Sequence, residues 1–159
     1  MASGSGAGET SGNVERRAES MKAKKDIAVA KFKQGYNCCQ AVICAYCEEF
    51  GVKEEDAFRL AEGFGSGMGG LKDTCGAVTG MFLTIGLVNS AGDMENPMKT
   101  KADTYRKFRE SAAKFTEENG SVYCRDLKNM DGPQPLVCCI KCVEDAAAMI
   151  DEMFADREA

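Results

Sequence analysis

The stretch GFGSGMGGLKDTCGAVTGMFLTIGL, residues 63–87, decides how the rest of the chain can fold. Five of its first eight residues are glycine, and such density marks backbone that turns sharply or is approached closely by another group. Cys75 then opens an uncharged apolar segment that runs to Val88. Within it, Gly76 and Gly80 place small residues one helical turn apart. We therefore expect a Gly-rich loop, followed by a buried central helix with Cys75 in its first turn.

Cys75 is the candidate reactive residue of this stretch. The first turn of a helix has unpaired N–H groups and a partial positive charge, so it stabilises a thiolate, the form of cysteine that attacks, binds metal and carries redox chemistry. A small apolar cysteine packed in a core helix is the alternative interpretation. The glycine backbone beside Cys75 can supply N–H donors to a bound group. The candidate cofactor-binding residues are therefore Gly65, Gly67, Gly69 and Gly76.

Composition limits the classes of function. The chain has 159 residues, of which 44% are hydrophobic and 28% charged, as in an ordinary globular domain. Its net charge of -5 argues against nucleic acid and anionic membranes as partners. No apolar run reaches the roughly 20 residues of a membrane span, and the first residues lack the apolar core of a signal peptide. We expect a cytoplasmic protein with no membrane span; its redox partner is unknown, and a homodimer stays open.

Nine cysteines and no histidine narrow the chemistry further. In the cytoplasm, cysteines at this number favour metal binding or redox chemistry over a disulfide framework. The lack of histidine excludes histidine-ligated zinc, histidine-ligated haem and any Cys–His catalytic pair. Whatever chemistry the protein performs must therefore use sulfur.

Helical spacing of apolar residues extends along most of the chain, and no alternating strand pattern appears. We predict an all-α protein in which residues 13–156 form a single domain, a bundle of about six helices. Residues 1–12 are Gly/Ser-rich and are expected to be a disordered leader, and whether residues 1–20 are native stays open.

The expected helix boundaries come from local signals. A first helix begins near Val14 and ends at Gly35, and Asn37 caps the next one. Acidic residues open a short helix over residues 53–63 in which Leu60 faces inward. Asn96-Pro97 starts a helix that ends at Asn119-Gly120. That helix carries an apolar stripe of Met98, Ala102, Tyr105, Phe108, Ala112 and Phe115, and a last helix spans Cys138 to Phe154.

Four cysteines lie at the edges of these expected elements: Cys38, Cys75, Cys124 and Cys139. They are far apart in sequence, so only the fold can bring them together. By contrast, the C-x-x-C pair of Cys44 and Cys47 lies inside a helix, where packing is the simpler interpretation. Three further cysteines flank the four and are open as packing residues, resolving thiols or substitute ligands: Cys39, Cys138 and Cys142.

The motifs resemble the C-GCAxxG-C-C family of redox-active proteins over about residues 30–154. They are G-Y-N-C at 35–38, G-F-G-x-G-M-G at 63–69, C-G-A-V-T-G at 75–80, an isolated Cys124 and C-x-x-x-V at 139–143. The four cysteines that define the family fall on Cys38, Cys75, Cys124 and Cys139. The resemblance implies a small bacterial or archaeal protein, often linked to transporter genes. A similar domain accompanies haem and an iron centre in split-Soret cytochromes, but this chain has no C-x-x-C-H motif, so covalent c-type haem is not expected.

Three functions compete at this stage. The first is electron transfer through an iron–sulfur cluster held by the four cysteines, because such clusters take four thiolates and are tuned by backbone N–H donors. The second is thiol–disulfide or persulfide chemistry with Cys75 as the nucleophile. The third is a structural four-cysteine zinc site without catalytic activity.

Overall fold

The structure is a computed structural model that describes residues 24–155, so the expected leader and the beginning of the first predicted helix lie outside the described residues. The described residues contain no β-strand and a single isolated bridge, between Thr74 and Tyr123. This confirms the all-α bundle. In chain order the helices are residues 24–33, α2 (Cys38–Tyr46), α3 (Glu54–Ala61), α4 (Gly65–Met68), α5 (Gly76–Asn89), α6 (Lys101–Asn119), α7 (Cys124–Leu127) and α8 (Cys139–Met153), with 3₁₀ turns η1 (Cys47–Phe50) and η2 (Glu62–Phe64).

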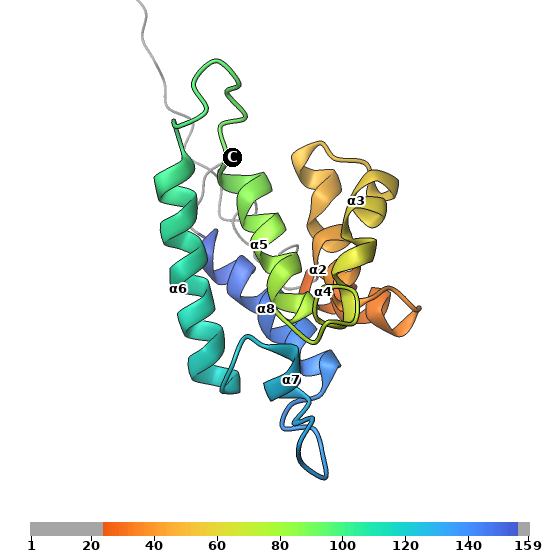
Figure 1. The fold of residues 1–159 in the computed structure, drawn as a ribbon. Coiled ribbons are helices and arrows are strands. Elements are labelled where there is room, and N and C mark those ends of the chain that lie inside the picture. Colours follow the sequence, from red (N-terminus) through yellow and green to blue (C-terminus); the bar gives the residue numbers. More distant parts are fainter. Residues whose placement is uncertain (1–23, 156–159) are drawn as a thin grey trace, which may run out of the picture.

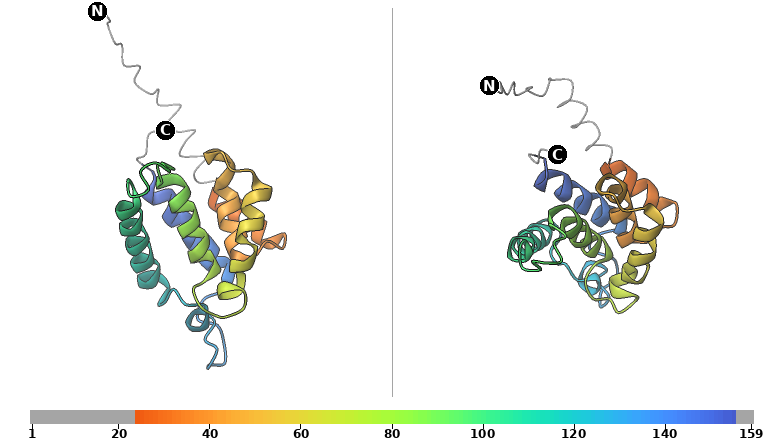
Figure 2. Two further views of the ribbon diagram at one scale, coloured as in Figure 1. Left: turned by 45° about the horizontal axis from the view of Figure 1, so that its top comes forward. Right: turned by 90° about the horizontal axis from the view of Figure 1, so that it is seen from above.

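The uncharged helix α5 lies at the centre of the bundle. Figure 1 shows α6 along one side of α5 and α2 with α3 on the other, and both views of Figure 2 agree. The main partners of α5 are α2 and α8. Three of its side chains, Val78, Met81 and Ile85, have no exposed surface. The prediction of a buried central helix is therefore confirmed.

Gly80 lets α5 approach α2 closely. A Cβ atom on Gly80 would lie 2.9 Å from the carbonyl oxygen of Cys39 and 2.9 Å from the Cβ of Val42. Carbon atoms in van der Waals contact prefer about 3.5–4.0 Å, so any side chain here would force the two helices apart. The small residue is a requirement of the packing.

Two predicted helix boundaries are confirmed. Asn37 caps α2: its side-chain oxygen accepts from the N–H of Gln40 at 2.9 Å, and the Gln40 side chain accepts from the N–H of Asn37 at 3.0 Å. This reciprocal capping box makes Cys38 the first residue of the helix. At the other predicted boundary, α6 ends at Asn119, and Gly120 adopts a φ of 94°, which favours glycine.

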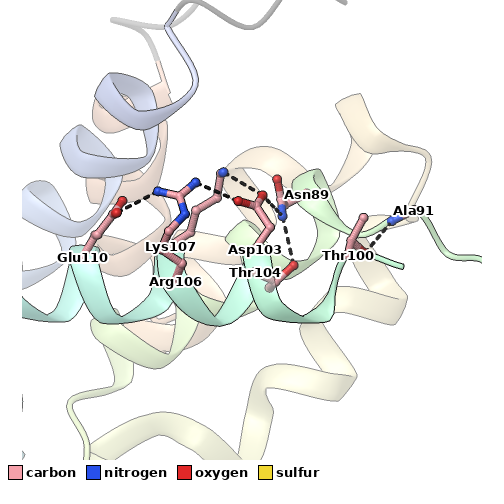
Figure 3. A network of polar contacts seen from close by, with 8 residues as sticks. All are labelled: Asn89, Ala91, Thr100, Asp103, Thr104, Arg106, Lys107 and Glu110. Atoms are coloured by element: carbon pink, nitrogen blue, oxygen red, sulfur yellow. Dashed lines mark hydrogen bonds and ion pairs between the residues drawn. The ribbon is translucent and has the colours of Figure 1, made fainter. Parts of the chain in front are cut away.

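The predicted start of α6 is wrong by several residues. The helix begins at Lys101 and not at Pro97, because residues 90–100 form a loop with hydrogen bonds of its own. The hydroxyl of Thr100 accepts from the N–H of Ala91 at 3.2 Å, and the Asn89 amide donates to Asp103 at 3.0 Å. Figure 3 shows this network, which joins the end of α5 to the first turn of α6.

Four apolar side chains that were predicted to face the core are exposed: Leu60, Met98, Ala102 and Tyr105. Met98 precedes the helix. On α3 the buried residues are Ala57 and Ala61, one turn apart, and Leu60 does not lie on the face that they form. Two other residues of the predicted stripe do pack inward: Phe115 of α6 is fully buried, and the ring of Phe108 stacks on Phe82 of α5 at a centroid distance of 4.4 Å. None of the described helices combines the length and the apolar character that a bilayer crossing requires.

Candidate functional site

Five cysteines line one cavity of about 220 Å³ at the end of the bundle where several helices begin. Figure 1 shows α5 and α8 starting near α7 at that end. Four of the five occupy helix starts: Cys38 opens α2, Cys75 is the N-cap of α5, Cys124 opens α7 and Cys139 opens α8. The fifth, Cys142, follows Cys139 by three residues on α8. The remaining lining residues are Phe32, Asn37, Ser66, Gly67, Gly76, Leu127, Lys128 and Val137.

The structure thus brings together all four cysteines that the sequence singled out and adds Cys142. In the sequence, the sign that Cys142 belongs with Cys139 is the spacing Cys139-x-x-Cys142, because residues three apart lie on the same face of a helix. The other C-x-x-C pair belongs elsewhere. Cys39, Cys44 and Cys47 are buried together in a separate apolar cluster with residues of α3, and Cys138 is exposed and does not line the cavity.

Two of the four candidate glycines border the cavity. A Cβ on Gly67 would lie 2.6 Å from the Cβ of Cys124, and one on Gly76 would lie 3.1 Å from the Cβ of Cys38. Both positions therefore keep space beside a cavity cysteine. Gly65 and Gly69 shape the loop without lining the cavity: a Cβ on Gly65 would meet the side chain of Asn37, and Gly69 adopts a φ of 70° at the end of α4.

Backbone hydrogen bonds fix Cys75 and Cys124 relative to each other. The N–H of Cys75 donates to the carbonyl of Val122 at 2.7 Å, and the N–H of Cys124 donates to the carbonyl of Asp73 at 2.6 Å. These bonds surround the isolated bridge at Thr74 and join two segments that are far apart in the chain. Cys75 is the N-cap of α5, one position before the first turn in which it was expected, and the Asp73 carboxylate accepts from the N–H of Thr74.

Four of the cavity thiols influence one another's pKa values in twos, Cys38 with Cys139 and Cys75 with Cys142. A hydrogen-bonding interaction with Cys142 lowers the pKa of Cys75, and one with Cys38 lowers the pKa of Cys139. The same interactions, together with burial, raise the pKa values of Cys38 and Cys142.

Helix starts and two lysines add to this pattern. The N–H groups of Ala77 and Val78, in the first turn of α5, also lower the pKa of Cys75. Lys128 and Lys72 lower the pKa of Cys139 through their charge. Burial nevertheless dominates at Cys124 and raises its pKa despite both lysines. The N–H donors that act on Cys75 thus belong to the first turn of α5.

No set of three or more cysteine, aspartate or glutamate side chains within residues 24–155 is arranged to hold a metal ion. The cavity lining also contains no carboxylate, so sulfur is its dominant donor.

A family model described as "Putative redox-active protein (C_GCAxxG_C_C)" matches residues 36–153. The chain belongs to this family. All five cavity cysteines of this C_GCAxxG_C_C protein lie inside the matched range. A protein of Archaeoglobus fulgidus described as "Uncharacterized protein" is 31% identical over 120 residues, which covers 71% of this chain and 79% of that relative. No solved structure matches the chain.

Proposed function

We propose that the protein transfers electrons through an iron–sulfur cluster bound in the cysteine-lined cavity. The observation that carries the proposal is the convergence of five thiols from four helices on one cavity that has no carboxylate. Soft thiolate ligands select iron–sulfur clusters, zinc and copper(I), and a cluster takes four of them. When bound, the cluster would supply one-electron chemistry that this set of side chains cannot perform alone.

The cavity offers the soft sulfur donors that such a group takes, although in their present arrangement no three of them are placed to hold a metal ion. Burial and thiol contacts raise the pKa values of Cys38, Cys142 and Cys124, so the bare cavity does not favour several thiolates at once. A bound metal cation would offset the cost of forming several thiolates in one cavity, because thiols that ligate a metal are deprotonated. Gly67 and Gly76 keep space beside Cys124 and Cys38.

The protein environment around the cavity also suits a redox centre. The N–H groups of Ala77 and Val78 donate to the sulfur of Cys75, and hydrogen bonds to ligating sulfurs tune the reduction potential. Phe32, Leu127 and Val137 supply apolar walls that limit water access, which also affects the potential.

A structural zinc site has less support. Tetrahedral zinc at about 2.3 Å from each thiolate needs four sulfurs mutually about 3.8 Å apart around one point. The described residues include no group of three or more side chains placed in that way, so the thiols would have to move to bind zinc.

Thiol–disulfide exchange is the second candidate, and it is favoured by the presence of Cys75 and Cys142 on one cavity and by the lowered pKa of Cys75. Cys75, the member with the lowered pKa, would attack a disulfide of a partner or a small molecule. Cys142 would then resolve the mixed disulfide, so that the partner leaves reduced and Cys75–Cys142 is left oxidised.

Anaerobic purification followed by iron, zinc and acid-labile sulfide analysis tests the proposal. We expect a brown protein with iron and sulfide in similar amounts and with visible absorption that dithionite bleaches. A Cys44→Ser variant, altered in the separate apolar cluster, should keep the same content. A colourless wild-type protein without iron would refute the cluster and leave thiol exchange, whereas one atom of zinc per chain would support the structural site.

A further inference from the structure

The cavity that holds the thiols also carries an unneutralised positive charge. Among the described residues that line it, Lys128 alone is charged, and none is a carboxylate. Lys128 is half-buried, and no carboxylate of the described residues forms an ion pair with it. Because partial burial strengthens electrostatic attraction, a cation in this position favours a negatively charged ligand.

A second lysine reaches the same cavity through Ser66. The Nζ of Lys72 donates to the Oγ of Ser66 at 2.6 Å, and Ser66 lines the cavity. Lys72 is also half-buried and has no ion pair with a described carboxylate. The adjacent carboxylate of Asp73 accepts from the N–H of Thr74 at 2.7 Å and does not line the cavity. Two cations and a hydroxyl group thus lie together at the cavity.

The backbone that places Ser66 and Lys72 is strained. Both residues adopt left-handed conformations, with φ values of 55° and 59°. Such values are uncommon for residues other than glycine, and they persist where surrounding contacts fix them, often at ligand-binding sites. Here the N–H of Asp73 donates to the carbonyl of Gly67 at 3.0 Å and closes the loop between the two residues. The loop therefore holds the Ser66 hydroxyl and the Lys72 ammonium at the cavity despite the strain.

The size and the chemistry of the cavity limit the ligand. Its volume of about 220 Å³ exceeds the roughly 150 Å³ of a cavity that holds benzene, so it admits a small molecule and not a peptide. Thiolates attack sulfur–sulfur bonds. A small anion that contains such a bond uses both the positive charge and the thiols, and thiosulfate is the simplest example.

We propose that the cavity binds a small anionic sulfur compound of the thiosulfate type, with its oxyanion end held by Lys128 and the Ser66–Lys72 pair and its outer sulfur attacked by Cys75. The thiolate of Cys75 forms a bond to the outer sulfur, the sulfur–sulfur bond breaks, and sulfite leaves with the electron pair. Cys75 is left as a persulfide, and the step consumes no oxidant or reductant. This inference rests on thiol chemistry at Cys75, the second candidate above, and names its substrate class.

A single-turnover reaction of the metal-free, reduced, full-length protein with thiosulfate tests the step. The products are alkylated with iodoacetamide and analysed by peptide mass spectrometry, and released sulfite is measured. We expect one additional sulfur atom on Cys75 and an equal amount of sulfite. Lys128→Gln should need about tenfold more thiosulfate for the same rate, because it loses a charged hydrogen-bond donor. The control Lys101→Gln, which alters an exposed lysine where α6 begins, should match the wild type.

The charge preference of the cavity can be measured without thiosulfate. Iodoacetate and iodoacetamide alkylate thiols in the same way, but only iodoacetate is an anion. Cys138 is exposed and outside the cavity, so it is an internal control. We expect the ratio of the iodoacetate rate to the iodoacetamide rate to be about tenfold higher at Cys75 than at Cys138. The ratio at Cys75 should fall in Lys128→Gln, and added salt should lower it in the wild type.

Equal ratios at Cys75 and Cys138 that salt does not change would overturn the anion site, whether or not the Lys128→Gln variant folds. Absence of sulfite, or additional sulfur on a cysteine other than Cys75, would overturn the reaction. These results differ from failure of thiol chemistry itself, in which iodoacetamide does not modify Cys75. They also differ from failure of the proposed cluster, in which the protein contains no iron when it is purified anaerobically.

Discussion

The contact between α5 and α2 at Gly80 predicts opposite effects for the same substitution at two glycines of one helix. A Cβ on Gly80 would lie 2.9 Å from a backbone oxygen and 2.9 Å from the Cβ of Val42, so one of the two helices must shift. A Cβ on Gly86 meets nothing within 4 Å. Gly80→Ala therefore overpacks the bundle, at a cost of about 1–3 kcal/mol, of which better helix propensity returns up to about 1 kcal/mol. Gly86→Ala gains about 0.5–1 kcal/mol by propensity alone.

Urea or thermal unfolding followed by far-ultraviolet circular dichroism measures both effects. For a chain of this size a change of about 1 kcal/mol moves the melting temperature by roughly 2–4 °C. We expect Gly86→Ala to melt about 2–4 °C above the wild type, and Gly80→Ala to melt below it by up to about 8 °C. Equal melting temperatures for the two variants would show that α5 and α2 are not in close contact at Gly80, and the packing argument would then be wrong.

Three further predictions concern the cap of α2, a buried carboxyl group and the thiols. Asn37→Ala removes the capping box and should cost about 1 kcal/mol in urea unfolding, whereas Asn96→Ala, in a loop, should change stability by less than about 0.5 kcal/mol. Burial raises the pKa of Asp151 to about 6 despite the hydrogen bond from Tyr46. Because its folded pKa exceeds its unfolded value, its stabilising contribution is present at low pH and is lost as the pH rises through about 6. Asp151→Asn should remove this pH-dependent loss of stability, which amounts to about 1–2 kcal/mol after allowance for solvent screening. Comparison of the free energy of unfolding at acidic and at neutral pH measures the loss in the wild type and in the variant. In metal-free reduced protein at mildly acidic pH, iodoacetamide should modify Cys139 and Cys75 before Cys44. The pKa values of Cys139 and Cys75 are lowered, whereas burial raises the pKa of Cys44 to about 12. Peptide mass spectrometry measures the order of modification, and a result in which Cys44 is modified first would contradict this prediction.

Local signals predicted the features that depend on neighbouring residues. The cap at Asn37, the end of α6 at Gly120 and the uncharged α5 all follow from residues within a few positions of each other. The start of α6 could not be predicted in this way. Asn89 holds that first turn through Asp103, 14 residues away, so a bond between two elements overrides the Asn96-Pro97 signal.

The same distinction applies to the site. Residue type and helix-start position were enough to single out Cys38, Cys75, Cys124 and Cys139, and all four line the cavity. The place of Cys142 in the cavity could not be predicted from the sequence, because it depends on how α8 lies against α2 and α5. Packing of these helices brings Cys142 to the same cavity as Cys75, although 142 − 75 = 67 positions separate the two residues in the chain.

The positive charge around the cavity limits how many of its thiols can be deprotonated at once, and a bound cluster would change that limit. Three full-length helices, α2, α5 and α8, begin at the cavity, and each helix start carries about half a positive charge. Together they supply about +1.5, to which Lys128 adds one. Four thiolates carry a charge of about −4, more than this environment can offset, whereas two thiolates carry only about −2, which it can balance. In line with this limit, the pKa values of Cys75 and Cys139 are lowered and those of Cys38 and Cys142 are raised. Full deprotonation of all four thiols therefore requires additional positive charge inside the cavity, and the iron of a cluster would provide it.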